Sequence, residues 1–208
     1  MNTCNPFTTM TNRTRDEVAK QMLMVVVALS GLTCAAAAQT WQIDPNHTAA
    51  QFSVRHLGIS TVRGVFEKTT GTVNFDPSDP WKSSIDATID VNTINTRVPT
   101  RDNDLRSPHF FDAAKYPTIT FKSTRTELAG EGKLKVTGDL RIHGVTKQVV
   151  LDVDGPSPAI KDSLEIMRVG ANATTKINRN DFGITTMPEM IGDEIQIVLD
   201  VEMTRRVK

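Results

Sequence analysis

The chain has 208 residues, and its 24 Lys and Arg residues balance its 24 Asp and Glu residues, so the formal net charge is zero. A neutral chain with two Trp and one Tyr has neither the basic surface nor the stacking side chains typical of nucleic-acid-binding proteins. Both cysteines, Cys4 and Cys34, precede residue 39, which excludes disulfides, thiolate metal sites and cysteine nucleophiles from the rest of the chain.

The first residues have the three-part layout of a secretory signal. Basic residues between positions 13 and 20 precede an apolar run at 22–33, and Ala36 and Ala38 stand three and one positions before Gln39. The apolar run is shorter than the roughly 20 residues that a membrane-spanning helix needs. The pattern therefore predicts an exported protein.

We expect a signal peptide over 1–38, cleaved near Ala38, and one mature domain over 39–208. Two alternatives stay open. One is an uncleaved anchor, and the other is a lipid attached to Cys34. The second is the weaker, because no Leu stands three residues before Cys34 and Thr33 precedes it directly.

Most of the mature domain consists of short runs in which apolar and polar residues alternate. A brief run at 41–43 leads into an Asp-Pro-Asn turn. The later runs are 51–56, 62–66, 70–75, 84–91, 118–123, 133–142, 147–153, 167–177 and 194–203. Successive side chains of a strand point to opposite faces, so each run predicts a strand with one dry face. Roughly eight or nine strands joined by short turns are typical of an all-β sandwich or barrel.

The clearest alternation lies at 133–142, where charged and Thr side chains occupy one face. The opposite face collects apolar and small residues, namely Leu134, Val136, Gly138, Leu140 and Ile142. A helix would distribute the charged residues around its whole circumference. This segment therefore predicts a strand with one buried face.

One segment, 99–114, breaks the alternation. Thr100 is expected to cap a short helix, with Asp102 and Asp104 in the first turn, where the helix dipole favours acids. Pro108 is expected to end the helical turns. We therefore predict one or two short helical turns that close one end of the strand structure.

The inward positions of the predicted strands are aliphatic or Phe, with small residues such as Ala87 and Ala173 among them. An eight-stranded barrel has an interior just large enough for packed side chains or for one small ligand. The small residues favour a ligand cavity, which is commonly found in the mouths of β-barrels. A tightly packed sandwich remains the alternative.

Motifs spread along the chain resemble those of the YceI family. They are DPNH at 44–47, FSVRHLG at 52–58, GVF at 64–66, FDP at 75–77, RDNDL at 101–105, GDLRIHGVT at 138–146, NRNDFG at 178–183 and GD at 192–193. The resemblance extends in order over about 41–203, nearly the whole mature domain. It implies an eight-stranded antiparallel lipocalin-like barrel with one or two short helices at one end.

The resemblance also implies a bacterial periplasmic protein that binds a long-chain isoprenoid lipid, of the quinone or prenyl phosphate type. The tail is expected in the apolar cavity and the head group near its mouth. Three positions depart from the family pattern: Asp104 stands where the family usually has His, His109 lies near the position of an acid, and Ala171 replaces an aromatic residue. The first two departures are expected to change head-group preference, and the third to widen the cavity.

We expect the ligand to contact the inward side chains and the helical segment, with the most space at Gly138. The expected ligand-binding residues are Phe52, Val54, His56, Phe66, Phe75, Ala87, Ile89, Arg101, Phe110, Phe111, Phe121, Leu134, Val136, Gly138, Leu140, Ile142, Ala173 and Phe182.

Two of these residues have alternative interpretations. His56 is either a hydrogen-bonded core residue or a polar contact on the cavity wall. Arg101 either pairs with a carboxylate or binds an anionic head group. His47 and His143 are expected in turns.

No pair of histidines has metal-binding spacing, and there is no Gly-x-Ser-x-Gly motif, so we expect no catalytic residue, no metal and no cofactor. Binding of another amphiphile, such as a fatty acid or amide, is an alternative, and an enzyme acting on a lipid head group is a less favoured one. The expected partners are the lipid and, transiently, a membrane, but no nucleic acid. The oligomeric state stays open, a homodimer included.

Overall fold

The computed structural model describes residues 39–76 and 80–206. The expected signal peptide, 1–38, lies outside the described residues. The strands are β1 (Gln39–Ile43), β2 (Ala49–His56), β3 (Ser60–Phe66), β4 (Thr69–Phe75), β5 (Ser84–Asp90), β6 (Ile94–Asn95), β7 (Thr118–Gly130), β8 (Lys133–Ile142), β9 (Val145–Asp154), β10 (Ile160–Lys161), β11 (Ile166–Asn178) and β12 (Ile191–Arg206). One α-helix, α2 (Pro99–Arg106), and three 3₁₀ turns, η1 (Pro80–Lys82), η2 (Val91–Thr93) and η3 (Arg179–Phe182), complete the described elements.

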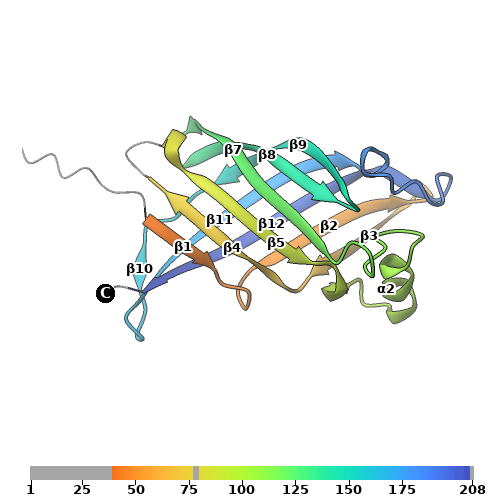
Figure 1. Cartoon of the computed structure of the whole chain (residues 1–208), viewed down its shortest axis with the longest axis horizontal. Helices are drawn as coiled ribbons and strands as arrows, with labels where there is room; N and C mark the ends of the chain where they lie inside the picture. The colour runs from red at the N-terminus through yellow and green to blue at the C-terminus, as the bar shows by residue number, and fades with distance from the viewer. Residues whose placement is uncertain (1–38, 77–79, 207–208) are drawn as a thin grey trace, which may run out of the picture. The chain divides into compact units, whose positions relative to one another are not determined.

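The strands form a closed eight-stranded antiparallel barrel, as expected (Figure 1). Around the barrel the order is β11, β9, β8, β7, β5, β4, β1 and β12, and β12 pairs again with β11 to close the sheet. The closing ladder is long, since it extends from the pair Ile166 and Arg206 to the pair Asn178 and Glu194. Closure removes the unpaired edges that an open sheet would expose.

β1 and β2 lie end to end along β12. Ile43 of β1 is paired with Met203 near the end of β12, whereas His56 of β2 is paired with Ile191 at its start. β3 and β4 are likewise paired with β2 and β1, respectively. The short breaks between these strands therefore interrupt two long strands of the barrel without opening it.

β8 has the predicted bounds, and its side chains alternate between buried and exposed along its length. On the outer face, Lys133 and Lys135 form cross-strand ion pairs of 2.9 Å with Asp154 and Asp152 of β9. Such exposed pairs contribute little to stability. The stability that β8 adds to the folded protein therefore comes mainly from the burial of its apolar face.

β7 is longer than predicted, because a bulge interrupts the alternation of apolar and polar residues along this strand. The pairing register with β8 shifts between Ser123 and Arg125, so one extra residue stands on β7. After the bulge, Thr126 is buried and the strand continues to Gly130. The prediction ended at Ser123 because a bulge reverses which residues of a strand face inward. At 84–91 the prediction was one residue too long, since Val91 begins η2.

α2 begins earlier than predicted. Val98 is the N-cap residue, without a side-chain capping bond, and Pro99 occupies the first turn. Proline is favoured at this position because its fixed φ suits a helix and its missing N–H would have no partner there. The expected Thr100 cap was therefore wrong, and only Asp102 of the two acids lies in the first turn. None of the helices in the described residues has the length and apolar character needed to cross a bilayer.

The NRNDFG segment holds the loop that leads from β11 to β12. The buried guanidinium of Arg179 donates to the carbonyl oxygens of Ile184, Thr186, Ile191 and Gly192 and to the carboxylate of Asp193. Phe182 is buried in the core. The charge of Arg179 is thus fully used by the fold at this end of the barrel.

Candidate functional site: an apolar cavity in the barrel

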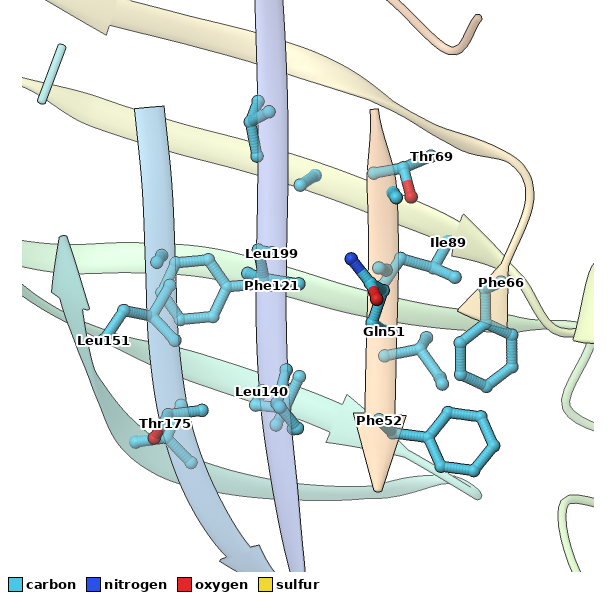
Figure 2. Close-up of a pocket in the computed structure, with 18 of the residues that line it drawn as sticks. Gln51, Phe52, Phe66, Thr69, Ile89, Phe121, Leu140, Leu151, Thr175 and Leu199 are labelled. Atoms are coloured by element: carbon cyan, nitrogen blue, oxygen red, sulfur yellow. The ribbon is translucent and has the colours of Figure 1, made fainter. Parts of the chain in front are cut away.

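A cavity of about 590 Å³ lies inside the barrel. This volume falls in the range of small-molecule binding sites, roughly 300–1,000 Å³. Its wall is formed by the inward side chains of nearly every strand, among them Phe121 of β7, Leu140 of β8, Leu151 of β9 and Leu199 of β12 (Figure 2). The geometry of an eight-stranded barrel allows its interior to be either packed or hollow. In this protein the interior is hollow.

All the expected ligand-binding residues except Gly138 line this cavity. They are Phe52, Val54, His56, Phe66, Phe75, Ala87, Ile89, Arg101, Phe110, Phe111, Phe121, Leu134, Val136, Leu140, Ile142, Ala173 and Phe182. The strand alternation located those on strands, because it identifies the inward face of each strand. The others, Arg101, Phe110, Phe111 and Phe182, lie outside the strands.

The expectation of most space at Gly138 was wrong. Gly138 faces inward, but the Phe121 ring on the neighbouring strand covers it, and a β-carbon at Gly138 would lie 2.4 Å from Phe121 Cζ. Gly138 therefore makes room for an aromatic side chain of the wall. The cavity lies on the other side of that ring.

Several wall residues were not among the expected ones. Leu151, Leu199 and Val201 belong to strands whose alternation already marked them as inward. Met187 and Met190 come from the loop before β12, where no periodic pattern could indicate them. Thr69, at the start of β4, is a polar wall residue that stands one position before the predicted run at 70–75.

The helical segment closes one end of the cavity with aromatic rings. Phe66 packs edge-on against Phe111, with 5.6 Å between ring centroids, and Phe52 lies 5.6 Å from Phe66 in a tilted arrangement. Phe110 is buried in the same cluster. Aromatic pairs in such arrangements add to the stability gained from burial alone, so these rings are held firmly in this part of the wall.

Arg101 of α2 reaches the cavity and is held by one residue. Its Nε donates to Thr96 Oγ1 at 2.8 Å, and its Nη2 donates to the Thr96 carbonyl oxygen at 2.9 Å. The buried carboxylate of Asp102 accepts hydrogen bonds from the Thr96 amide and hydroxyl. Within residues 39–76 and 80–206 no carboxylate forms an ion pair with Arg101, so the expected structural alternative, pairing with an acid, is replaced by binding to Thr96.

The histidines occupy different settings. His56 lines the cavity, and in the described part of the chain its imidazole has no hydrogen-bond partner, which favours the cavity-wall alternative. His143 lies in the β8–β9 turn, where its ring packs edge-on to Tyr116 at 4.8 Å between centroids. His109 lies on the exposed side of the helical segment, where its Nδ1 is 3.4 Å from Oδ1 of Asp104. Of the residues in this paragraph, His56 and Asp104 line the cavity, whereas His109, His143 and Tyr116 do not.

A separate polar cluster lies on the outside of the barrel. Ligand atoms of Asp44, His47 and Glu202 lie within 4.8 Å of one another, close enough for a metal ion. However, Arg168 donates to the carboxylates of Asp44, at 3.2 Å, and Glu202. The positive charge among these acids is therefore supplied by the protein itself.

Arg168 also affects the protonation of its acidic neighbours. Its hydrogen bond to Asp162, at 2.7 Å, holds the pKa of that carboxyl below its usual value, with the Ile166 amide contributing. Burial by itself would raise the pKa of Asp44, but hydrogen bonds from His47, the Asn46 amide and Arg168 outweigh burial and lower it. The pKa of Arg168 is raised by its own hydrogen bonds to the carboxylates of Asp162, Glu202 and Asp44.

Comparisons with known proteins agree with this architecture. A UPF0312 protein of Vibrio cholerae is 37% identical over 172 residues, which cover 81% of this chain and 90% of that protein. The crystal structure of the Campylobacter jejuni YceI protein is 34% identical, with a TM-score of 0.65 over 74% of this chain and 90% of that one. A polyisoprenoid binding domain from Saccharophagus degradans shares the fold, with a TM-score of 0.58 at 16% identity, covering 78% of this chain and 97% of that domain. The YceI-like domain matches residues 41–203, and the chain therefore belongs to the YceI family.

Proposed function

We propose that this protein is a periplasmic binding and carrier protein that holds a long-chain isoprenoid lipid in the barrel cavity. The observation that carries the proposal is the cavity itself, whose wall is almost entirely aliphatic and aromatic. Support also comes from the fold shared with a domain described as polyisoprenoid-binding. The signal-like start of the sequence supports a periplasmic location.

The wall suits a chain rather than a compact ligand. Cavity-lining residues are found near both ends of the barrel, from Gln39 and Pro156 at one end to Met187 and Met190 at the other. A lipid tail lying along this wall would leave water over its length, at a gain of about 0.8 kcal/mol for each buried CH₂ group. An isoprenoid tail, with a methyl branch every few carbons, would fill a wall of Leu, Ile, Val and Phe side chains well.

Binding accounts for the polar groups at the helical end better than catalysis does. Thr96 holds Arg101 in place, and Asp102 is occupied with Thr96. Arg101 keeps Nη1 free of hydrogen-bond partners in the described residues, so it can meet the polar end of a ligand. An enzyme acting on a head group would need an acid or base aimed at the ligand. The buried Asp102 is committed to the fold, which leaves His56 and Asp104 as the wall groups for that alternative.

A carrier must receive its lipid, and we propose transient contact with a membrane at the end where β2 and β3 join. Leu57 and Ile59 are exposed in the turn between these strands, and the Leu57 amide donates to the Met190 carbonyl oxygen at 2.8 Å. Met187 and Met190 are partly exposed and also line the cavity. Exposed apolar side chains of the outer loops thus adjoin residues of the cavity wall, and we propose that a tail leaves the bilayer along them.

The decisive experiment is mass spectrometry of an organic extract from mature protein purified from its native compartment. A stoichiometric isoprenoid lipid is the expected result. A fatty acid or amide would instead support the alternative amphiphile, and turnover of a bound lipid that depends on His56 or Asp102 would support an enzyme. Protein that carries nothing, and that takes up no isoprenoid lipid when supplied with one, would refute the proposal.

A further inference from the structure

One polar side chain on the cavity wall has no partner. Thr69 starts β4 opposite Ile89 of β5, on the same face as Val73, and it lines the cavity (Figure 2). Its residue is only 6% exposed, and its Oγ1 has no hydrogen bond to any residue that the structure describes. A buried hydroxyl of this kind costs free energy in the folded protein unless something else satisfies it.

Other hydroxyls on the wall are satisfied by the fold. Thr175 Oγ1 donates to the Val150 carbonyl oxygen at 2.8 Å, and Thr48 Oγ1 donates to the Glu202 carbonyl oxygen at 3.3 Å. Thr126 Oγ1 lies 3.4 Å from the Ser83 carbonyl oxygen. Thr69 lies on the same wall but differs from these residues, because its hydroxyl has no such carbonyl partner among the described residues.

Water is a poor candidate for the missing partner. A buried water needs two to four polar neighbours. Thr69, however, is paired with Ile89 and lies on a cavity wall that is mostly apolar. A ligand that fills the cavity would displace a weakly held water in any case.

We propose that the Thr69 hydroxyl hydrogen-bonds an uncharged polar group of the bound lipid, such as a quinone carbonyl, a phenol or an amide. This inference rests on the proposed function and selects among its head groups. A phosphate at Thr69 would be buried as a charge, at a large cost in free energy unless a cation reached it. The cationic wall residues are Arg55, Arg101 and Arg179. Arg55 and Arg179 are engaged with the fold where β2 and β3 join, and Arg101 is held by Thr96.

The test compares two lipids that differ in the head group. Delipidated wild-type protein and Thr69→Val are titrated with a long-chain isoprenoid quinone and with squalene, an isoprenoid hydrocarbon. Trp41 lines the cavity, so its fluorescence can report binding. For Thr69→Val we expect the Kd for the quinone to rise about threefold to tenfold, the value of one hydrogen bond, and the Kd for squalene to stay unchanged.

Two variants separate hydrogen bonding from shape. Thr69→Ser keeps the hydroxyl and is expected to retain quinone binding. Thr93→Val, outside the cavity wall, removes a hydroxyl that donates to the Asp90 carbonyl oxygen at 2.6 Å, and it is expected to lower the Tm without changing lipid preference. Thr69→Val is expected to be at least as stable as the wild type, since the buried hydroxyl has no partner to lose.

An unchanged Kd for the quinone, or an equal loss for both lipids, would overturn the inference and leave the proposed function intact. Tighter binding of a prenyl phosphate than of the quinone by the wild type would also overturn it. A wild-type protein that binds none of the three lipids would refute the proposed function itself.

Discussion

The ring of Phe121 lies over Gly138 of the neighbouring strand, so that a β-carbon on Gly138 would lie 2.4 Å from Cζ and 2.6 Å from Cε2 of that ring. The Lys122 carbonyl oxygen would lie at 2.7 Å. Real β-carbons essentially never approach other atoms so closely, so any larger residue must push the ring or the backbone away. Gly138 is thus required by the wall of the cavity.

Gly138→Ala is expected to destabilise the protein by about 1–3 kcal/mol, because the extra methyl group overpacks the site and displaces the Phe121 ring toward the cavity. Chemical denaturation measures the change. Gly170→Ala, on β11, is the matched control, since the nearest atom to its β-carbon would lie 3.9 Å away. It is expected to be neutral or slightly stabilising. Equal effects of the two substitutions would contradict the packing of Phe121 on Gly138.

Ala87→Trp and Ala173→Trp place an indole ring in the cavity, which both alanines line. We expect each variant to lose more lipid uptake than stability, because an empty cavity can accept the ring, whereas a packed core would lose about 1–3 kcal/mol. Lipid uptake and urea denaturation are measured on the same samples. Strong unfolding without a specific loss of uptake would contradict a ligand cavity.

Asp102→Ala removes the carboxylate that accepts the Thr96 amide and hydroxyl hydrogen bonds. Asp102 is 8% exposed, so these donors would be left buried, and we expect a loss of about 1–3 kcal/mol in the free energy of unfolding. Asp104→Ala on the same helix is the control, because the Asp104 carboxylate is more exposed, and it is expected to change stability by less than about 0.5 kcal/mol. Similar losses in both variants would argue against the network around Thr96.

Acid is expected to weaken the barrel through Asp44 and Asp162, whose pKa values are lowered in the folded state. Carboxylates of this kind contribute stability above their ordinary pKa and lose it as the pH falls through their folded-state pKa, so the loss is expected below about pH 4. Denaturation curves at pH 7 and pH 3 measure it. Arg168→Met, which removes the shared guanidinium, should reduce the difference between the two pH values, and an unchanged difference would contradict the role of Arg168.

Ile59→Ser is expected to slow lipid transfer from vesicles several-fold, because it removes an apolar side chain, 81% exposed, at the proposed membrane-contacting end. Transfer of a fluorescent isoprenoid lipid from vesicles to the protein measures the rate. Ile160→Ser is the control, because Ile160 is 63% exposed on β10 at the opposite end of the barrel. Equal slowing in both variants, or none in Ile59→Ser, would refute contact at the β2–β3 turn.

The sequence by itself determined which side of most strands is buried. In β8, the alternation of Leu134 and Val136 with Lys133 and Lys135 predicts the observed burial, because the two-residue period of a strand is a local property of the backbone. The same period identified the inward wall residues of most strands, but not those of the loops, such as Met187 and Met190. It failed at the β7 bulge, where one extra residue reverses the inward and outward sides.

Only the tertiary structure decided what those buried faces enclose. Gly138 and Thr69 both point inward, but the first is covered by Phe121, whereas the second lines the cavity and its buried hydroxyl has no partner among the described residues. Arg101 is held by Thr96 rather than by an acid. Each of these outcomes depends on side chains brought close by strand pairing, closure or a loop. Local periodicity records which way a side chain points, whereas packing determines what it meets there.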